Sequence, residues 1–89
     1  MTSTAPDRDQ RDLGVQPLDT LMNELVIDNH ELVEASTEQL THKQVQKARK
    51  GRRLTKNIQM KVKNAIEKAL LARGEERSFV LTDLFNYRA

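Results

Sequence analysis

The chain has 89 residues, enough for one small domain, and its 15 basic and 13 acidic residues leave a net charge of only +2. It contains no Cys and two His, which excludes disulfides, thiolate zinc sites and histidine-rich metal sites. With one Tyr, two Phe, no Trp, three Gly and two Pro, the chain must build an aliphatic core and favours helices. We therefore expect an all-α protein without a metal or cofactor.

No segment of the sequence resembles a targeting or membrane-spanning element. The first apolar cluster follows Asp7, Asp9 and Asp12 rather than a basic region, and no apolar run reaches the length that crosses a bilayer. We expect neither secretion nor membrane insertion. Because cysteines are absent, the expected compartment is the cytoplasm.

The charge is divided unevenly along the chain. Residues 1–38 contain nine acidic and two basic residues, a net charge of −7, whereas residues 67–89 contain four of each. Residues 39–66 contain no acidic residue and nine basic ones, which are Lys43, Lys47, Arg49, Lys50, Arg52, Arg53, Lys56, Lys61 and Lys63. The excess positive charge therefore lies in this middle segment, which is the candidate surface for an anionic partner.

The sequence predicts a tail and one domain. Residues 1–15 are polar and show no sustained periodicity, which predicts a flexible tail followed by one domain over residues 16–89.

The first helix of the domain is predicted to begin at Pro17, since the fixed φ of proline suits the first helical position. Apolar residues then recur with helical spacing at Leu18, Leu21, Met22 and Leu25.

A start signal for a second helix lies at Asp28. Its side chain can cap the helix, and Glu31 can reach back to the cap. Ile27 before the cap can also pack on Leu32 after it. We therefore predict a short helix here, followed by the polar stretch 36–39.

The same capping pattern predicts a third helix. Thr41 is its cap, Gln44 occupies the third helical position, and Leu40 can pack on Val45. Gly51 should end the helix because it readily adopts a left-handed conformation.

A fourth helix gives the strongest periodic signal in the chain. Thr55 can cap it, Gly74 can end it, and one apolar face is formed by Ile58, Val62, Ala65, Ile66, Ala69 and Leu70. Residues 78–87 then hold all three aromatic side chains. We expect this segment to pack on the domain's own core, with a dimer interface as the alternative.

The third predicted helix has a narrow apolar seam. Only Val45 and Ala48, three residues apart, can face inward. The remaining positions offer donors that match guanine O6 and N7, and groups that can bond base edges; they are His42, Lys43, Gln46, Lys47 and Lys50. A short basic helix of this kind fits the major groove of DNA, and Arg52, Arg53 and Lys56 after it can meet phosphates.

The pattern Thr-x-x-x-Val-x-x-Ala-x-x-Gly over residues 41–51 resembles the recognition helix of the phage repressor and Cro family, the lambda-repressor-like helix-turn-helix proteins. Residues 29–32 (Asn-His-Glu-Leu) resemble the start of that family's second helix, and residues 81–85 (Leu-Thr-Asp-Leu-Phe) its closing segment. The likeness covers roughly residues 17–87. It implies a compact bundle of four to five short helices with a helix-turn-helix.

The function implied is sequence-specific binding of double-stranded DNA by a transcriptional regulator, nucleoid-associated when bound. Helix 41–50 would be the recognition helix in the major groove, and a homodimer on DNA is left open.

Composition and resemblance together give two groups of candidate contact residues. The base-reading group is His42, Lys43, Gln44, Gln46 and Lys47, with Gln44 partly engaged in the cap. The phosphate-binding group is Asn29, His30, Arg49, Lys50, Arg52, Arg53 and Lys56. One departure concerns the stretch from Leu32 to Thr41, which is about two residues longer than is usual in the family and has no Gly in the turn. The angle between the two helices is therefore open.

The sequence also leaves two other kinds of binding protein open. A small helical adaptor, whose acidic and basic faces bind protein partners or each other between copies, is the alternative. RNA binding is less favoured, because no aromatic side chain lies among the basic residues to stack on unpaired bases. No nucleophile and base pair, carboxylate pair or phosphate-cradling glycine loop is visible, so we do not expect an enzyme.

Overall fold

Residues 13–87 are described by a computed structural model, and within this range the chain forms five helices and no strand. The helices are α2 (Pro17–Leu25), α3 (Asn29–Ala35), α4 (His42–Lys50), α5 (Lys56–Ala72) and the short α6 (Leu81–Leu84). The all-α prediction is confirmed. Most of the expected tail, residues 1–12, lies outside the described residues. None of the described helices is long and apolar enough to cross a membrane.

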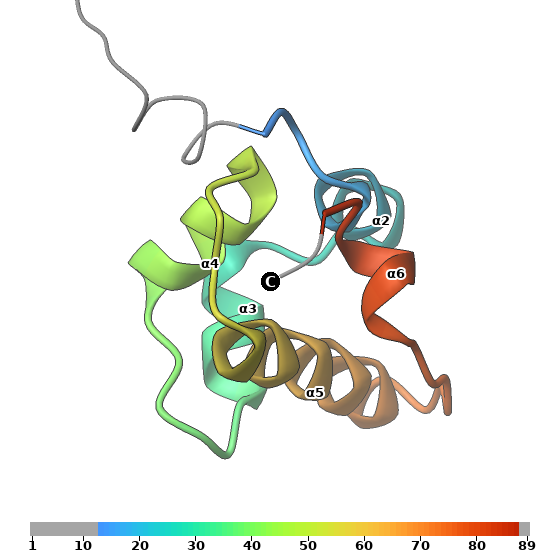
Figure 1. The fold of residues 1–89 in the computed structure, drawn as a ribbon. Coiled ribbons are helices and arrows are strands. Elements are labelled where there is room, and N and C mark those ends of the chain that lie inside the picture. Colours follow the sequence, from blue (N-terminus) through green and yellow to red (C-terminus); the bar gives the residue numbers. More distant parts are fainter. Residues whose placement is uncertain (1–12, 88–89) are drawn as a thin grey trace, which may run out of the picture.

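The helices close around a single core (Figure 1). The longest helix, α5, packs against α3, α4 and α6, and α2 packs against both α4 and α6. The apolar stripes predicted for the helices supply most of the interior. The buried apolar residues are Leu18, Met22, Ile27, Leu32, Leu40, Val45, Ala48, Leu54, Val62, Ala65, Ile66, Ala69, Leu70, Phe79, Leu84 and Phe85.

The predicted caps form in the structure. The Asp28 carboxylate accepts from the Glu31 N–H at 2.8 Å, and the Thr55 hydroxyl accepts from the Ile58 N–H at 3.3 Å. Thr41 and Gln44 form a complete capping box, each bonding the other's backbone N–H at 3.0 Å. These local signals therefore fix the starts of α3, α4 and α5.

The expectation that Glu31 completes the cap of α3 is wrong. Its carboxylate instead accepts two hydrogen bonds from Arg73, at 2.6 and 2.9 Å. Arg73 also donates to the backbone carbonyls of Leu25 and Val26, so one guanidinium joins the end of α5 to α2 and α3. A bidentate, charge-assisted pair is stronger than the neutral-donor bond of a capping box. The hydrogen bond to Glu31 raises the pKa of Arg73, against a smaller opposing effect of desolvation.

The turn between α2 and α3 contains a strained residue. Val26 has a φ of +55°, in the left-handed region that a β-branched side chain rarely adopts. It occupies the position after the helix where glycine is usual. Its side chain is exposed, whereas the next residue, Ile27, is buried. The left-handed turn thus brings Ile27 into the core, and Arg73 holds the Val26 carbonyl in place.

Residues 13–16 lie along the end of α4. The N–H of Leu13 donates to the carbonyl of Gly51 at 2.8 Å, and that of Gln16 donates to the carbonyl of Arg49 at 3.1 Å. Gly51 has a φ of +93°, as predicted for the end of this helix, and is buried beneath Gly14. The described fold therefore includes part of the segment expected to be a tail.

The aromatic segment packs on the chain's own core. Phe79 and Phe85 are buried, and Tyr87 is half-buried and lies against Phe85 in a T-shaped arrangement of the two rings. The side chain of Asp83 caps α6 by accepting from the Val80 N–H at 3.0 Å. The expectation of bundle closure is thus confirmed for these side chains.

Two buried glutamines give a matched pair for a stability test. Gln16 is bonded at both ends, since Nε2 donates to the Gly14 carbonyl and Oε1 accepts from the Asn86 N–H, each at 2.8 Å. Gln59 is equally buried, but its Nε2 has no partner among the described residues. Gln16→Met should lower the free energy of unfolding by about 1 to 2 kcal/mol, whereas Gln59→Met should raise it by about 1 kcal/mol. Urea denaturation measures both, and an equal loss in the two variants would contradict the assignment.

Candidate nucleic-acid interface

The inward and outward faces of α4 are sharply different. Val45 and Ala48 are completely buried, as the sequence predicts. Of the five side chains predicted to face outward, four are exposed and Lys47 is half-buried; the exposed ones are His42, Lys43, Gln46 and Lys50. Gln44 is half-buried because its amide oxygen serves the capping box. The helix therefore presents cations and amides on one continuous surface.

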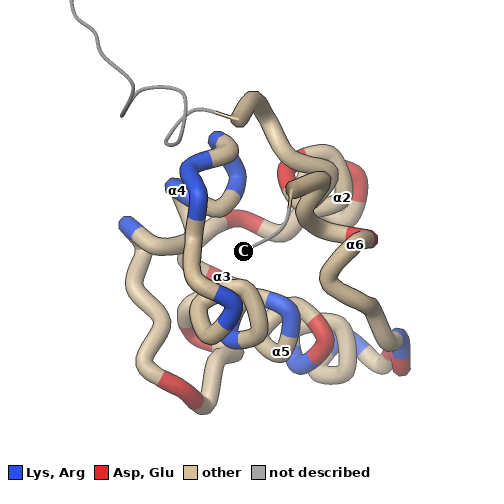
Figure 2. Tube along the Cα trace, viewed as in Figure 1, with Lys and Arg blue, Asp and Glu red and all other residues tan. Residues whose placement is uncertain are grey.

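Positive charge continues beyond the end of α4. Arg52, Arg53 and Lys56 are all exposed, on the connection to α5 and its first turn. Figure 2 shows Lys and Arg following α4, this connection and the start of α5, while Asp and Glu lie mainly on other elements. We call the surface formed by α4 and residues 51–56 the basic face.

Tyr87 holds the connection in place. Its hydroxyl accepts from the Leu54 N–H and donates to the Arg52 carbonyl, both at 3.0 Å. The guanidinium carbon of Arg53 lies 5.4 Å from the centre of the tyrosine ring, which is a cation–π contact. The C-terminal segment thus orders the basic residues that follow α4.

Arg49 belongs to the interior side of α4. Its guanidinium donates to Asp19 at 2.6 Å, to Asn29 at 2.7 Å and to Asn23 at 2.9 Å, and its side chain is only 17% exposed. The sequence groups Arg49 with the phosphate contacts because of its charge. In the structure the residue joins α4 to α2 and α3, so its guanidinium is used within the fold and does not belong to the basic face.

Asn29 is also engaged within the fold. Its Oδ1 accepts from Arg49, and its Nδ2 donates to Gln46 Oε1 at 2.9 Å. Its neighbour His30 is exposed and stacks on His42, with ring centroids 5.6 Å apart and an interplanar angle of 19°. These contacts bring the N-terminal ends of α3 and α4 side by side. Helix N-termini carry partial positive charge, which suits a phosphate at this end of the basic face.

Comparison with known proteins gave no relative. No family model, curated protein or solved structure matches the chain.

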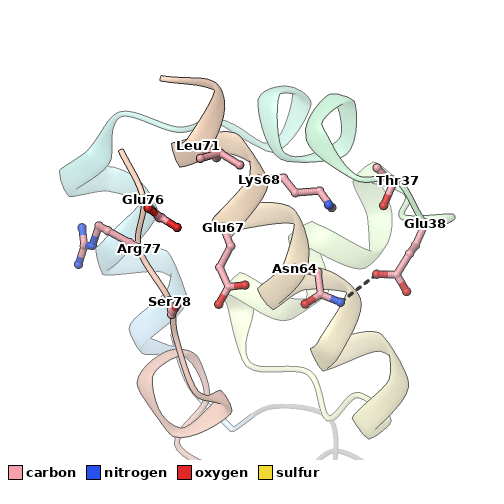
Figure 3. Close-up of a pocket in the computed structure, with 9 residues that line it drawn as sticks. All are labelled: Thr37, Glu38, Asn64, Glu67, Lys68, Leu71, Glu76, Arg77 and Ser78. Carbon is pink, nitrogen blue, oxygen red and sulfur yellow. Dashed lines mark hydrogen bonds between the residues drawn. The ribbon is translucent and has the colours of Figure 1, made fainter. Parts of the chain in front are cut away.

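A groove of about 480 Å³ lies between α5 and the segments 37–38 and 76–78 (Figure 3). Two of its three carboxylates bond other parts of the chain: Glu38 accepts from Asn64 at 3.1 Å, and Glu67 accepts from the Phe79 N–H at 2.7 Å and pairs with Lys63. Acidic and basic side chains are mixed along its walls. It lacks the single sign of charge that distinguishes the basic face. Residues 13–87 also contain no cluster of three or more His, Cys, Asp or Glu that could hold a metal ion.

Three residues that hold α4 or the basic connection in place were not predicted from the sequence. Asp19 and Asn23 orient Arg49, and Tyr87 positions the basic connection. Each acts on a residue that is distant in the chain, so no local spacing pointed to it. The one local signal was that Asp19 and Asn23 lie four residues apart on α2, on the same side of the helix, where they could together bind a cation such as Arg49.

Proposed function

We propose that the protein binds double-stranded DNA sequence-specifically as a transcriptional regulator, with α3 and α4 acting as a helix-turn-helix and α4 entering the major groove. The observation that carries the proposal is the outer face of α4. It presents Lys43, Gln46 and Lys47 from a helix whose only buried residues are Val45 and Ala48. Such donors and amides match base edges in the major groove.

The charge of the surroundings supports the same function. Residues 39–66 contain no acidic side chain, and exposed Arg52, Arg53 and Lys56 lie where phosphates would flank a groove occupied by α4. His30 would meet the backbone at the other end of the helix. The side chains of Arg49 and Asn29, in contrast, would position the reading helix rather than touch phosphate. Two copies of the protein would bind two half-sites as a dimer, as helix-turn-helix proteins usually do.

Four alanine variants test the division of roles. Sites selected from a random duplex library give a cognate duplex, and fluorescence anisotropy gives the affinity over a range of salt concentrations. Lys43→Ala and Lys47→Ala should weaken cognate binding about 5- to 150-fold, with less effect on random DNA. Arg52→Ala and Arg53→Ala should weaken both duplexes alike, and each should reduce the salt slope by about 1.

Lys68→Ala provides the control, since Lys68 is an exposed lysine in the groove away from the basic face. This variant should bind like the unaltered protein. Equal effects of all four test variants on both duplexes would show that α4 is not the reading helix. Absence of duplex binding even at low salt would contradict the DNA interface altogether and favour the adaptor function.

A further inference from the structure

A relay of hydrogen bonds runs from α2 to the outer face of α4. Arg49 Nε donates to Asp19 Oδ1 at 2.6 Å, and Arg49 Nη1 donates to Asn29 Oδ1 at 2.7 Å. Asn29 Nδ2 then donates to Gln46 Oε1 at 2.9 Å. The relay therefore ends on a residue of the proposed base-reading surface.

The donors and acceptors of the relay can be arranged in only one way. A guanidinium can only donate hydrogen bonds, and a carboxylate can only accept them. Because Arg49 donates to Asn29, the carbonyl oxygen of Asn29 must face it, and the amide nitrogen must face Gln46. Gln46 must in turn offer Oε1 to Asn29. The orientation of both amides thus follows from the charged group behind them.

This orientation changes what Gln46 offers to a base. An unconstrained glutamine presents a donor and an acceptor side by side, the combination that matches N6 and N7 of adenine. Here Oε1 is turned toward α3, and Nε2 has no acceptor among residues 13–87, although Gln46 is exposed. The bond to Asn29 occupies one lone pair of Oε1 and fixes the amide plane, so the end of the side chain turned away from α3 is the Nε2 group with its two N–H donors.

We propose that Gln46 reads its base as a hydrogen-bond donor only. It would favour a base that carries an exocyclic carbonyl in the major groove, guanine or thymine, over adenine and cytosine, which carry an amino group there. Asn29 and Arg49 act as positioning residues that hold this polarity. The inference rests on the proposed DNA binding and adds the chemistry of one specificity contact.

Site selection first locates the base pair concerned. The pair is the one at which Gln46→Ala loses the preference shown by the unaltered protein. Duplexes are then made that lack either the exocyclic carbonyl or the exocyclic amino group at that pair. Loss of the carbonyl should weaken binding by the unaltered protein about fivefold or more, and loss of the amino group should have little effect. Gln46→Ala should respond to neither change.

Asn29→Asp should turn the Gln46 amide around, so that it offers an acceptor to the base instead of a donor. One carboxylate oxygen would accept from Arg49 and the other from Gln46 Nε2, which turns Oε1 outward as an acceptor. This variant should then depend on the amino group of the pair and not on the carbonyl, with preferences at other pairs unchanged. Gln46→Glu should give the same reversal without altering Asn29, because a carboxylate can only accept. A purely structural role of Asn29 would weaken binding without exchanging the two sensitivities.

Asn57→Asp is the matched control for the added charge. Asn57 is exposed in the first turn of α5, near the basic face and outside the relay. The variant should lower overall affinity while keeping the dependence on the carbonyl. Dependence of the unaltered protein on the amino group, or an unchanged dependence in both Asn29→Asp and Gln46→Glu, would overturn the inference while leaving DNA binding intact. Failure of every protein to enrich any duplex would overturn the proposed function, and this inference with it.

Discussion

Gly51→Ala is expected to lower the free energy of unfolding by about 2 to 4 kcal/mol. Two effects add at this position. The φ of +93° is strained for any residue with a Cβ, and a Cβ here would overlap the backbone of Gly14. Backbone cannot move aside as a flexible side chain would, because Leu13 and Gln16 fasten that segment to the end of α4. Urea denaturation followed by circular dichroism measures the loss.

Gly74→Ala separates the two effects. Gly74 has a similar φ of +86°, but a Cβ there would meet no atom within 4 Å. Only the conformational strain remains, so the expected loss is about 1 kcal/mol. If the two variants lost the same stability, the packing of residues 13–16 on Gly51 would be refuted.

Arg49→Met is expected to lower the free energy of unfolding by about 2 to 3 kcal/mol. Met keeps much of the apolar stem, so the variant mainly removes the bonds to Asp19, Asn23 and Asn29. The variant leaves the carboxylate of Asp19 without its cation, which destabilises the folded state. Because this carboxylate is 28% exposed, water still hydrates it in part and reduces the loss. A double-mutant cycle with Asp19→Asn isolates the ion pair from the two amide contacts.

Lys50→Met is the control for the loss of charge. Lys50 is the next residue in α4 but is exposed, and no bond to another described residue is found for its side chain. Its replacement should change stability by no more than about 0.5 kcal/mol. Equal stability of the Arg49 and Lys50 variants would show that the network does not hold α4 against α2 and α3.

The helix starts could be predicted because their signals are local. Asp28, Thr41 and Thr55 each bond a backbone N–H three residues ahead. Gly51 and Gly74 likewise mark helix ends through their own conformation. The end of α2 carries no such mark. Val26 adopts the left-handed conformation there, between a buried Ile27 and the bonds that Arg73 makes to the Leu25 and Val26 carbonyls.

The contacts that assemble the helices were out of reach of pattern reasoning. Arg49 bonds Asp19 from 30 residues away, and Arg73 bonds Glu31 from 42 residues away. Arg49 and Arg73 have long cationic side chains, and their charge alone does not show whether they contact a partner at the surface or another part of the fold. The outer face of α4 was predictable for the opposite reason, because two apolar residues three apart determine which side of a short helix is buried.

The most direct test of the proposed DNA interface is an amide-shift titration of isotope-labelled protein with a random-sequence duplex, first at low and then at moderate salt. Each amide reports its own surroundings, so the titration locates a contact as well as detecting it. We expect salt-sensitive shifts concentrated at His30 and over residues 41–56, weakening as salt rises. Absence of shifts at low salt, or shifts confined to the groove beside α5, would contradict the account.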